Sequence, residues 1–233
     1  HYYKLSLNKD SKLFLSVTNN SGSSAVFDST MNHVAKLSER EPLFLKAGEY
    51  TVRADYSSPT YGVLASYIPS EGAYNALASL GSTSYKATTY NHFYKLNLSQ
   101  DSSLMLNVMH NSGYSAVYDK NLNLVTTLSN SGPLTLEAGE YVVHASYSSP
   151  KYAVIESYIA SDSAYDLLPS LETGSYRSAS YNQYYKVSLD QDSKLMLNVA
   201  NNSGYSAIYD KNLDLVTKLS SNEPISLAAG EYV

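Results

Sequence analysis

The sequence of 233 residues contains no cysteine and no tryptophan. The absence of cysteine excludes both a disulfide-stapled scaffold and a thiol nucleophile. No apolar run approaches the roughly 20 residues that a membrane-spanning helix needs. The 16 basic residues are scattered, and the net charge is −5. We therefore expect no membrane insertion and no nucleic-acid partner, because proteins that bind nucleic acid usually present a basic stripe.

The chain does contain a repeat with a period of 91 residues. The opening segment His-Tyr-Tyr-Lys at residues 1–4 returns as His-Phe-Tyr-Lys at 92–95 and as Gln-Tyr-Tyr-Lys at 183–186. Three glycines keep the same spacing, which are Gly48, Gly139 and Gly230. Each glycine precedes Glu-Tyr in an expected hairpin turn, where we predict a positive φ because glycine has no Cβ to clash. A period of this length suits an autonomous folded domain.

Within one copy, short segments of alternating apolar and polar residues are separated by turn-forming residues. Residues 94–98 and 104–108 both alternate and flank the turn sequence Gln-Asp-Ser-Ser, which predicts a hairpin of half-buried strands. Further short strands at this spacing continue to residue 159, which indicates a β-sandwich or barrel. We expect module boundaries that divide the chain into residues 1–72, 73–163 and 164–233. The first module then lacks its opening strand and the third ends within a strand, so we expect a longer array.

Two corresponding stretches, residues 72–80 and 163–171, lack the strand pattern. We predict short helical junctions there, with Ser163 as an N-cap and Pro169 limiting the second helix. Opening strands are expected to follow at residues 84–89 and 175–180. Apolar residues at intervals of three in each stretch should pack on the neighbouring module and make the connection semi-rigid, namely Tyr74, Leu77, Leu80, Tyr165, Leu168 and Leu171.

Several segments resemble the bacterial pre-peptidase C-terminal domain. The similar segments are the strand at 94–98, Val-Tyr-Asp at 117–119, Asn-Leu-Asn-Leu-Val at 121–125 and Leu-Glu-Ala-Gly-Glu-Tyr-Val-Val at 136–143. The resemblance implies tandem jelly-roll-like antiparallel β-sandwich modules, secreted and often attached to extracellular enzymes or surface proteins. Some members of that family bind calcium or a polymer. The family's paired aspartates are replaced here by Gly-Tyr-Ser at 113–115, and no catalytic activity accompanies the family module itself.

Candidate catalytic and metal-binding residues are few. The chain has no Gly-x-Ser-x-Gly, Gly-rich phosphate loop or His-Glu-x-x-His sequence, so we expect no enzyme, no catalytic residue and no cofactor. His144 has Arg53 at its equivalent position, which argues against a catalytic histidine. Asp101 and Asp119 recur at each period; they suit turns, in which aspartate accepts backbone N–H bonds, better than a calcium site with six or more oxygen ligands. We therefore expect no metal.

Tyrosine is the most distinctive component, with 24 residues. Tyr141 and its equivalents follow Gly-Glu and are expected in the core. Two further tyrosines lie four apart on an expected strand, so that both point to one face, and both recur one period later. We propose this set as a candidate ligand-binding row, with cross-strand packing as the alternative; its members are Tyr114, Tyr118, Tyr205 and Tyr209.

These observations lead to one functional expectation and one alternative. We expect non-catalytic repeat modules of a large secreted or cell-surface bacterial protein, acting in adhesion or as a semi-rigid spacer. The partners would be neighbouring repeats of the same chain, with extracellular polysaccharide or a surface protein as candidate ligands. The alternative is an accessory C-terminal array that targets a secreted hydrolase, such as a protease, to a polymer.

Overall fold

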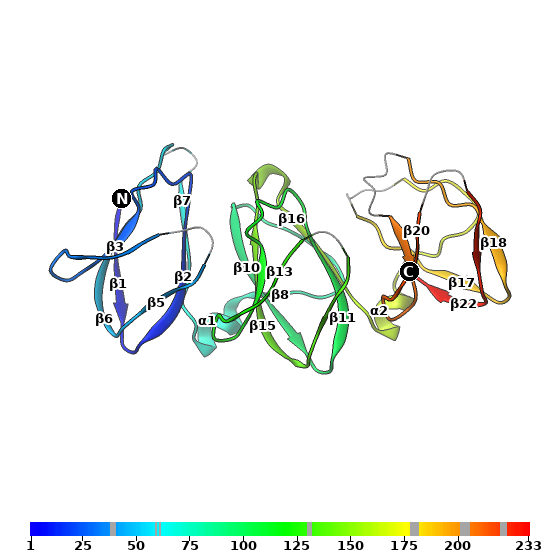
Figure 1. Cartoon of the computed structure of the whole chain (residues 1–233), viewed down its shortest axis with the longest axis horizontal. Helices are drawn as coiled ribbons and strands as arrows, with labels where there is room; N and C mark the ends of the chain where they lie inside the picture. The colour runs from blue at the N-terminus through cyan, green and yellow to red at the C-terminus, as the bar shows by residue number, and fades with distance from the viewer. Residues whose placement is uncertain are drawn as a thin grey trace.

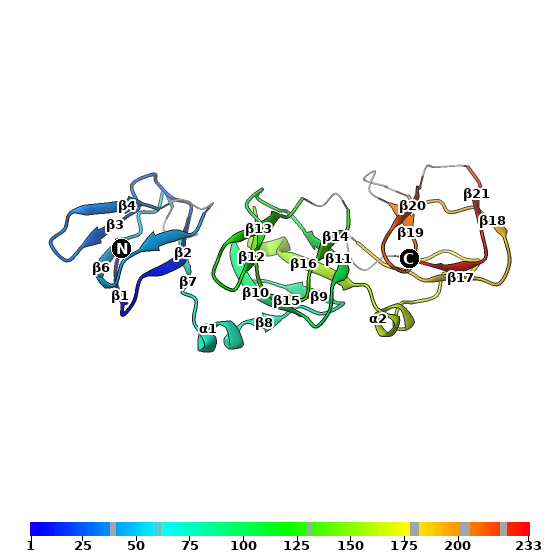
Figure 2. The same cartoon turned by 60° about the horizontal axis from the view of Figure 1, so that its bottom comes forward.

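The computed structural model describes residues 1–37, 41–58, 60, 62–129, 132–177, 182–200, 206–219 and 223–233. Strands make up 50% of the structure and helices 7%, with several antiparallel sheets, so the predicted all-β class is confirmed. Figures 1 and 2 show three groups of strands in a row, with the N terminus in the first and the C terminus in the third. We call residues 1–72, 73–163 and 164–233 modules one, two and three. Among the described residues, no helix is long and apolar enough to cross a bilayer.

The secondary structure elements follow one another in each module as short strands, with two short helices at the junctions. Module one contains β1 (Tyr2–Leu7), β2 (Ser11–Thr18), β3 (Ala25–Asp28), β4 (His33–Lys36), β5 (Leu43–Leu45), β6 (Gly48–Arg53) and β7 (Val63–Tyr67). The first junction and module two contain α1 (Glu71–Ala76), β8 (Ala78–Ser79), β9 (Ser84–Lys86), β10 (Asn91–Leu98), β11 (Ser102–Val108), β12 (Ala116–Asp119), β13 (Leu124–Thr127), β14 (Leu134–Leu136), β15 (Gly139–Ser146), the 3₁₀ helix η2 (Pro150–Tyr152) and β16 (Val154–Ile159). The second junction and module three contain α2 (Asp162–Asp166), β17 (Val187–Leu189), β18 (Ser193–Leu195), β19 (Ala207–Tyr209), β20 (Leu215–Lys218), β21 (Ile225–Leu227) and β22 (Gly230–Tyr232).

Module two is built from two sheets that share one core. The strand orders are β13-β12-β15-β10-β8 and β14-β11-β16-β9. Along β10 the inward side chains alternate as predicted, so that Tyr94, Leu96 and Leu98 are buried while Lys95 and Asn97 point outward. They meet Leu104 and Ile155 of the opposite sheet in the core. All pairs in these sheets are antiparallel except β8 with β10, which is parallel.

Corresponding strands pair in the same register in all three modules. Strand β1 pairs with β6, β10 with β15 and β17 with β22, in each case antiparallel. The pair Leu96↔Tyr141 of module two has counterparts 91 residues away on either side, namely Leu5↔Tyr50 and Val187↔Tyr232. Equivalent residues of the sequence repeat therefore occupy equivalent places on these strands.

The junction helices are shorter than predicted, and their caps lie further upstream. Ser161, not Ser163, caps α2: its hydroxyl accepts a hydrogen bond from the Ala164 N–H at 3.1 Å. Helix α1 ends at Ala76 because Ala78 and Ser79 pair with β10 and Leu80 enters the core of module two. Figures 1 and 2 show α1 between the first two groups of strands and α2 between the last two.

Three further predictions about secondary structure need correction. The expected opening strand at 84–89 is only Ser84–Lys86, and residues 175–177 form no strand, while 178–180 lie outside the described residues. Helix is not confined to the junctions, because Pro150 begins the 3₁₀ turn η2, for which proline's fixed φ is suited.

The recurring glycine has the predicted positive φ at two of its three positions. Gly48 and Gly230 have φ of +156° and +157°, a backbone conformation that residues with a Cβ rarely adopt, whereas Gly139 has no positive φ. At Gly139 the ring of Tyr141 folds back over the backbone, so that a Cβ there would lie 3.4 Å from the ring, in van der Waals contact. The Tyr141 hydroxyl donates to the Glu137 carbonyl at 2.8 Å, a bond that the equivalent tyrosines also make. This hydrogen bond holds the turn at all three positions, including the one where the predicted φ is absent.

Candidate functional site

The predicted tyrosine row does not form an open ligand-binding surface. Tyr118 is 3% exposed, Tyr114 and Tyr209 are half-buried, and Tyr205 lies outside the described residues. Tyr118 lies on β12 and faces module one, with its ring centroid 6.3 Å from that of Phe14. A ligand therefore has no face of Tyr118 on which to stack, and the prediction for this residue is wrong. Tyr118 packs instead on its cross-strand neighbour Val142, as the alternative predicted, and on the preceding module.

Tyr118 belongs to an apolar cluster between modules one and two, which we call the first boundary cluster. Its buried members are Phe14 and Tyr67 from module one with Tyr74, Ala116, Tyr118, Leu122 and Val142, and Ala73, Leu77 and Phe93 pack against them. Phe14 is fully buried on the outer face of β2. The Phe93 ring stacks on Tyr67 at 5.5 Å and meets Phe14 edge-on at 5.3 Å. Such aromatic pairs contribute energy beyond the area that they bury.

A second boundary cluster lies between modules two and three. Its buried members are Met105, Tyr158, Ala164 and Leu213, with Ala160, Leu168, Tyr184, Tyr209 and Val233 packed against them. Met105, Tyr158, Tyr184, Tyr209 and Leu213 stand 91 residues after Phe14, Tyr67, Phe93, Tyr118 and Leu122. The two boundaries therefore join the same faces of the modules. Tyr209 serves this contact in module three as Tyr118 does in module two.

Two leucines reach the boundaries from strained turns. Leu122 has φ +61° and Leu213 has φ +67°, although both side chains are almost completely buried. A left-handed conformation costs such a residue roughly 1–2 kcal/mol, whereas burial of a leucine side chain contributes about 1.5–3 kcal/mol. Asp119 fixes the first of these turns, since its Oδ1 accepts from the N–H groups of Asn121 and Asn123, each at 2.8 Å. The recurring aspartate therefore acts as the predicted turn residue.

A lysine clamps each junction helix onto the following module. Lys120 Nζ lies 2.9 Å from Glu71 of α1 and 2.6 Å from Glu140 of β15, with the Tyr74 ring centroid 5.3 Å away. Hydrogen bonds to Glu140 and Glu71 raise the pKa of Lys120 above its usual range. Lys211 repeats the arrangement at α2, at 2.8 Å from both Asp162 and Glu231.

A histidine is buried at the first boundary. His144 is fully buried on β15. Its ring centroid lies 4.4 Å from that of Phe14 and 5.0 Å from that of Phe93. Its Nε2 lies 2.9 Å from Asn91 Oδ1. Burial lowers the pKa of His144 to about 3, so the imidazole is neutral at pH 7. This position holds Arg53 in module one, which is half-buried. The environment of His144 is that of a packing residue.

The other recurring aspartate links two turns. Asp101 Oδ1 accepts from the Ala138 N–H at 2.9 Å, and Asp10 and Asp192 make the same bond to Ala47 and Ala229. These carboxylates hold the turn between β10 and β11, and its equivalents, against the turn before the Gly-Glu-Tyr strand. Within the described ranges, no three histidine, aspartate or glutamate side chains gather in a manner suited to a metal ion.

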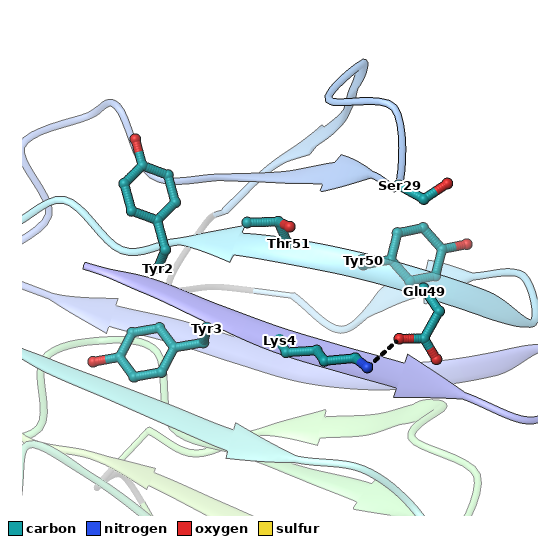
Figure 3. A pocket seen from close by; sticks show the side chains of 7 residues that line it. All are labelled: Tyr2, Tyr3, Lys4, Ser29, Glu49, Tyr50 and Thr51. Carbon is teal, nitrogen blue, oxygen red and sulfur yellow. Dashed lines mark ion pairs between the residues drawn. The ribbon is translucent and has the colours of Figure 1, made fainter.

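Module one carries a shallow pocket of about 350 Å³ on the face formed by β1 and β6 (Figure 3). Lys4 and Glu49 form an ion pair of 3.0 Å across the two strands. The two tyrosines of β1 lie at one end of the pocket, and Ser29 and Tyr50 lie toward the other. Tyr2 is 66% exposed. The pocket has a charged pair and aromatic rims, but no nucleophile with a neighbouring base.

Comparison with known proteins gives no assignment: no family model matches the chain, and no curated protein matches it. The similarity to the pre-peptidase C-terminal domain therefore remains a prediction from the sequence segments quoted above. The function has to be argued from the two boundaries and the faces that they join.

Proposed function

We propose that this chain is a semi-rigid spacer built from tandem jelly-roll-like β-sandwich modules, and that it belongs to a secreted or cell-surface bacterial protein. The single observation that carries the proposal is the equivalence of the two boundary clusters. A flexible tether would leave the ends of each module polar and exposed. Here equivalent outer faces are apolar, and they are buried at both boundaries.

The junctions add to this support. Each junction helix contacts the following module through three kinds of bond, which repeat at both boundaries. The Tyr74 hydroxyl donates to the Leu96 carbonyl at 3.2 Å, and Lys95 Nζ donates to the Asn75 carbonyl at 2.9 Å. Together with the lysine clamp, these bonds oppose rotation about the linker. A chain whose modules repeat one relative orientation can hold a distal region at a fixed distance from its attachment point.

The assignment to a secreted or surface protein rests on the cysteine-free composition and on the family resemblance. Adhesion to polysaccharide or to a surface protein is the second candidate activity, and burial of Tyr118 removes one residue of the tyrosine row suggested for it. Attachment to a secreted hydrolase is the alternative context, and the sequence adjoining the array distinguishes the two.

Small-angle X-ray scattering of the whole chain tests the spacer function. We expect the profile to fit one elongated arrangement of the three modules. Phe14→Ser should produce a profile that needs an ensemble of inter-module angles, because it places a hydroxyl in the first boundary cluster. Phe44→Ser is the matched control, since Phe44 is 60% exposed on module one. A broad ensemble for the unmodified chain would refute the proposal.

A further inference from the structure

The face that modules two and three turn toward their predecessors is open on module one. Phe93, Leu122 and Val142 form this face in module two, and their equivalents in module one are Tyr2, Met31 and Thr51. Met31 is 57% exposed, whereas Leu122 and Leu213 are 0% and 2% exposed. Met31 nevertheless keeps the same left-handed backbone, with φ +65°. In module one the strained turn therefore presents an apolar side chain without the burial that offsets the strain elsewhere.

The shallow pocket of module one lies where the other two modules hold a junction helix. Lys4, Glu49 and Tyr50 line it, and their equivalents in module two are Lys95, Glu140 and Tyr141. Lys95 donates to the end of α1, and Glu140 binds the lysine that clamps α1. Lys186 donates in the same way to the Asp166 carbonyl of α2, at 2.7 Å. With no helix on this face, Lys4 turns to Glu49 instead (Figure 3).

We infer that this face of module one is a docking surface for a further module of the same kind. The docked parts would be its junction helix and its trailing sheet, by which we mean the sheet that corresponds to the one containing β2 or β11. The occupant is defined by the chemistry that both junctions share, a serine N-cap followed by an acidic residue and then by Ala-Tyr-x-x-Leu. Its tyrosine would enter the pocket with its hydroxyl on the Leu5 carbonyl, as Tyr74 does on Leu96. Its trailing sheet would cover Met31, as Phe14 and Met105 cover the equivalent leucines.

Besides these apolar differences, one charged position makes this surface different from the two occupied ones. Ser29 replaces the clamping lysine found at Lys120 and Lys211. The acidic residue of a docked helix would therefore lack its ion pair, and Glu49 would lack the lysine partner that Glu140 and Glu231 have. We expect this docking to be weaker than the two internal contacts, and Ser29→Lys to strengthen it.

The test joins a copy of residues 92–182 directly before His1, so that the copied α2 precedes module one as α2 precedes module three. Intramolecular attachment makes even a weak contact measurable, because it sets a high effective concentration. Methionine oxidation by dilute peroxide, followed by peptide mass mapping, gives the readout. Met196, which is 67% exposed, is the exposed reference, and neither it nor Met31 falls in the copied segment.

In the original chain we expect Met31 and Met196 to oxidise at comparable rates. In the extended chain Met31 should slow on the order of tenfold relative to Met196, as a docked population of about nine tenths requires. Ser29→Lys should slow it further. Replacing the tyrosine of the copied junction with serine should restore rapid oxidation, because the pocket then loses its occupant.

Two results would overturn the inference. One is a Met31 rate that does not change in the extended chain with or without Ser29→Lys. The other is protection that survives loss of the copied tyrosine, which would mean that the helix is not the occupant. The inference rests on the proposed spacer function, but the two fail separately. Scattering of the original chain tests the spacer, while an elongated original chain with an unprotected Met31 in the extended one refutes only the docking surface.

Discussion

Phe14→Ala should release the histidine that the first boundary buries. Phe14 lies on the outer face of its own sheet, and its ring neighbours Phe93, Tyr118 and His144 all belong to module two. The substitution therefore removes little from the core of module one. It opens a space between the modules, and water reaches the His144 ring on the side that Phe14 covered.

The magnitude follows from the present pKa. Burial holds the pKa of His144 at about 3, against 6.5 for the exposed group. Phe93 still stacks on the ring after the substitution, so we expect partial recovery by roughly 1–3 pKa units. The loss of a buried phenylalanine also destabilises the chain, by at most about 3–5 kcal/mol where the cavity cannot close.

The same pKa fixes the sign of the pH dependence. The unfolded chain gains a proton at His144 as the pH falls through 6.5, whereas the folded chain does not until about 3. The folded state is therefore most favoured above 6.5, and its stability falls by up to about 1.4 kcal/mol per pH unit below that. Phe14→Ala should narrow the pH range over which stability falls. The folded state then accepts the proton at a higher pH, so the fall ends at a higher pH than in the unmodified chain.

Nuclear magnetic resonance titration of the His144 ring protons measures the pKa, and urea unfolding at pH 7 and pH 5 measures the linked stability. Phe44→Ala is the control for removal of an exposed phenyl ring from the same module. Met105→Ala opens the second boundary and should leave His144 unchanged. If His144 of the Phe14→Ala chain titrates as in the unmodified chain, module one does not cover this ring and the boundary is wrongly described.

Three further outcomes are expected. The Asn107 amide donates to the Tyr184 hydroxyl at 2.6 Å, so Tyr184→Phe removes this acceptor and should lower the free energy of unfolding by about 1–3 kcal/mol. Adding Asn107→Ser should recover part of this loss in urea unfolding. A double variant no more stable than the single one would contradict the argument. Tyr141→Phe should cost about 0.5–1.5 kcal/mol through its lost bond to Glu137, and an unchanged unfolding midpoint would count against that bond. Lys120→Gln should raise the pKa of Glu71, which the hydrogen bond from Lys120 now lowers, and an unmoved carboxyl titration would show that the clamp does not form in solution.

The sequence predicted the strands well because each core forms within one module. Alternation placed Tyr94, Leu96 and Leu98 inward, and Tyr141 lies in the core as expected. The prediction for the junction residues was correct only in part. Tyr74 and Leu77 pack at the boundary, but Leu80 enters the core of module two. A spacing of three predicts one helix face, whereas the chain here leaves the helix and continues as a strand before it reaches Leu80.

The contribution of the sheets to the boundaries was missed because it comes from their outer faces. Strand β11 was interpreted as alternating, yet Leu104, Met105 and Leu106 are all buried. Strand β2 has the same continuous apolar run around Phe14. Such a run is typical of strands covered on both faces, and it was the available signal. Nothing local says what covers the second face, and the partner lies in the next module. The tyrosine row was misplaced for the same reason.

The two boundaries share a geometry but differ in their polar contacts. The same asparagine of the repeat supplies the donor at both: Asn91 Nδ2 donates to the Thr18 hydroxyl of module one at 3.2 Å, and Asn182 Nδ2 lies 3.2 Å from the Met109 sulfur of module two. At the second boundary the Glu156 carboxylate also accepts from the Asn182 N–H at 3.0 Å, whereas module one has Ala65 at the position of Glu156. A buried polar group costs free energy when its partner is absent. Apolar packing thus sets how any two modules stack, and the partner that each preceding module offers to the shared asparagine adjusts the strength of the contact.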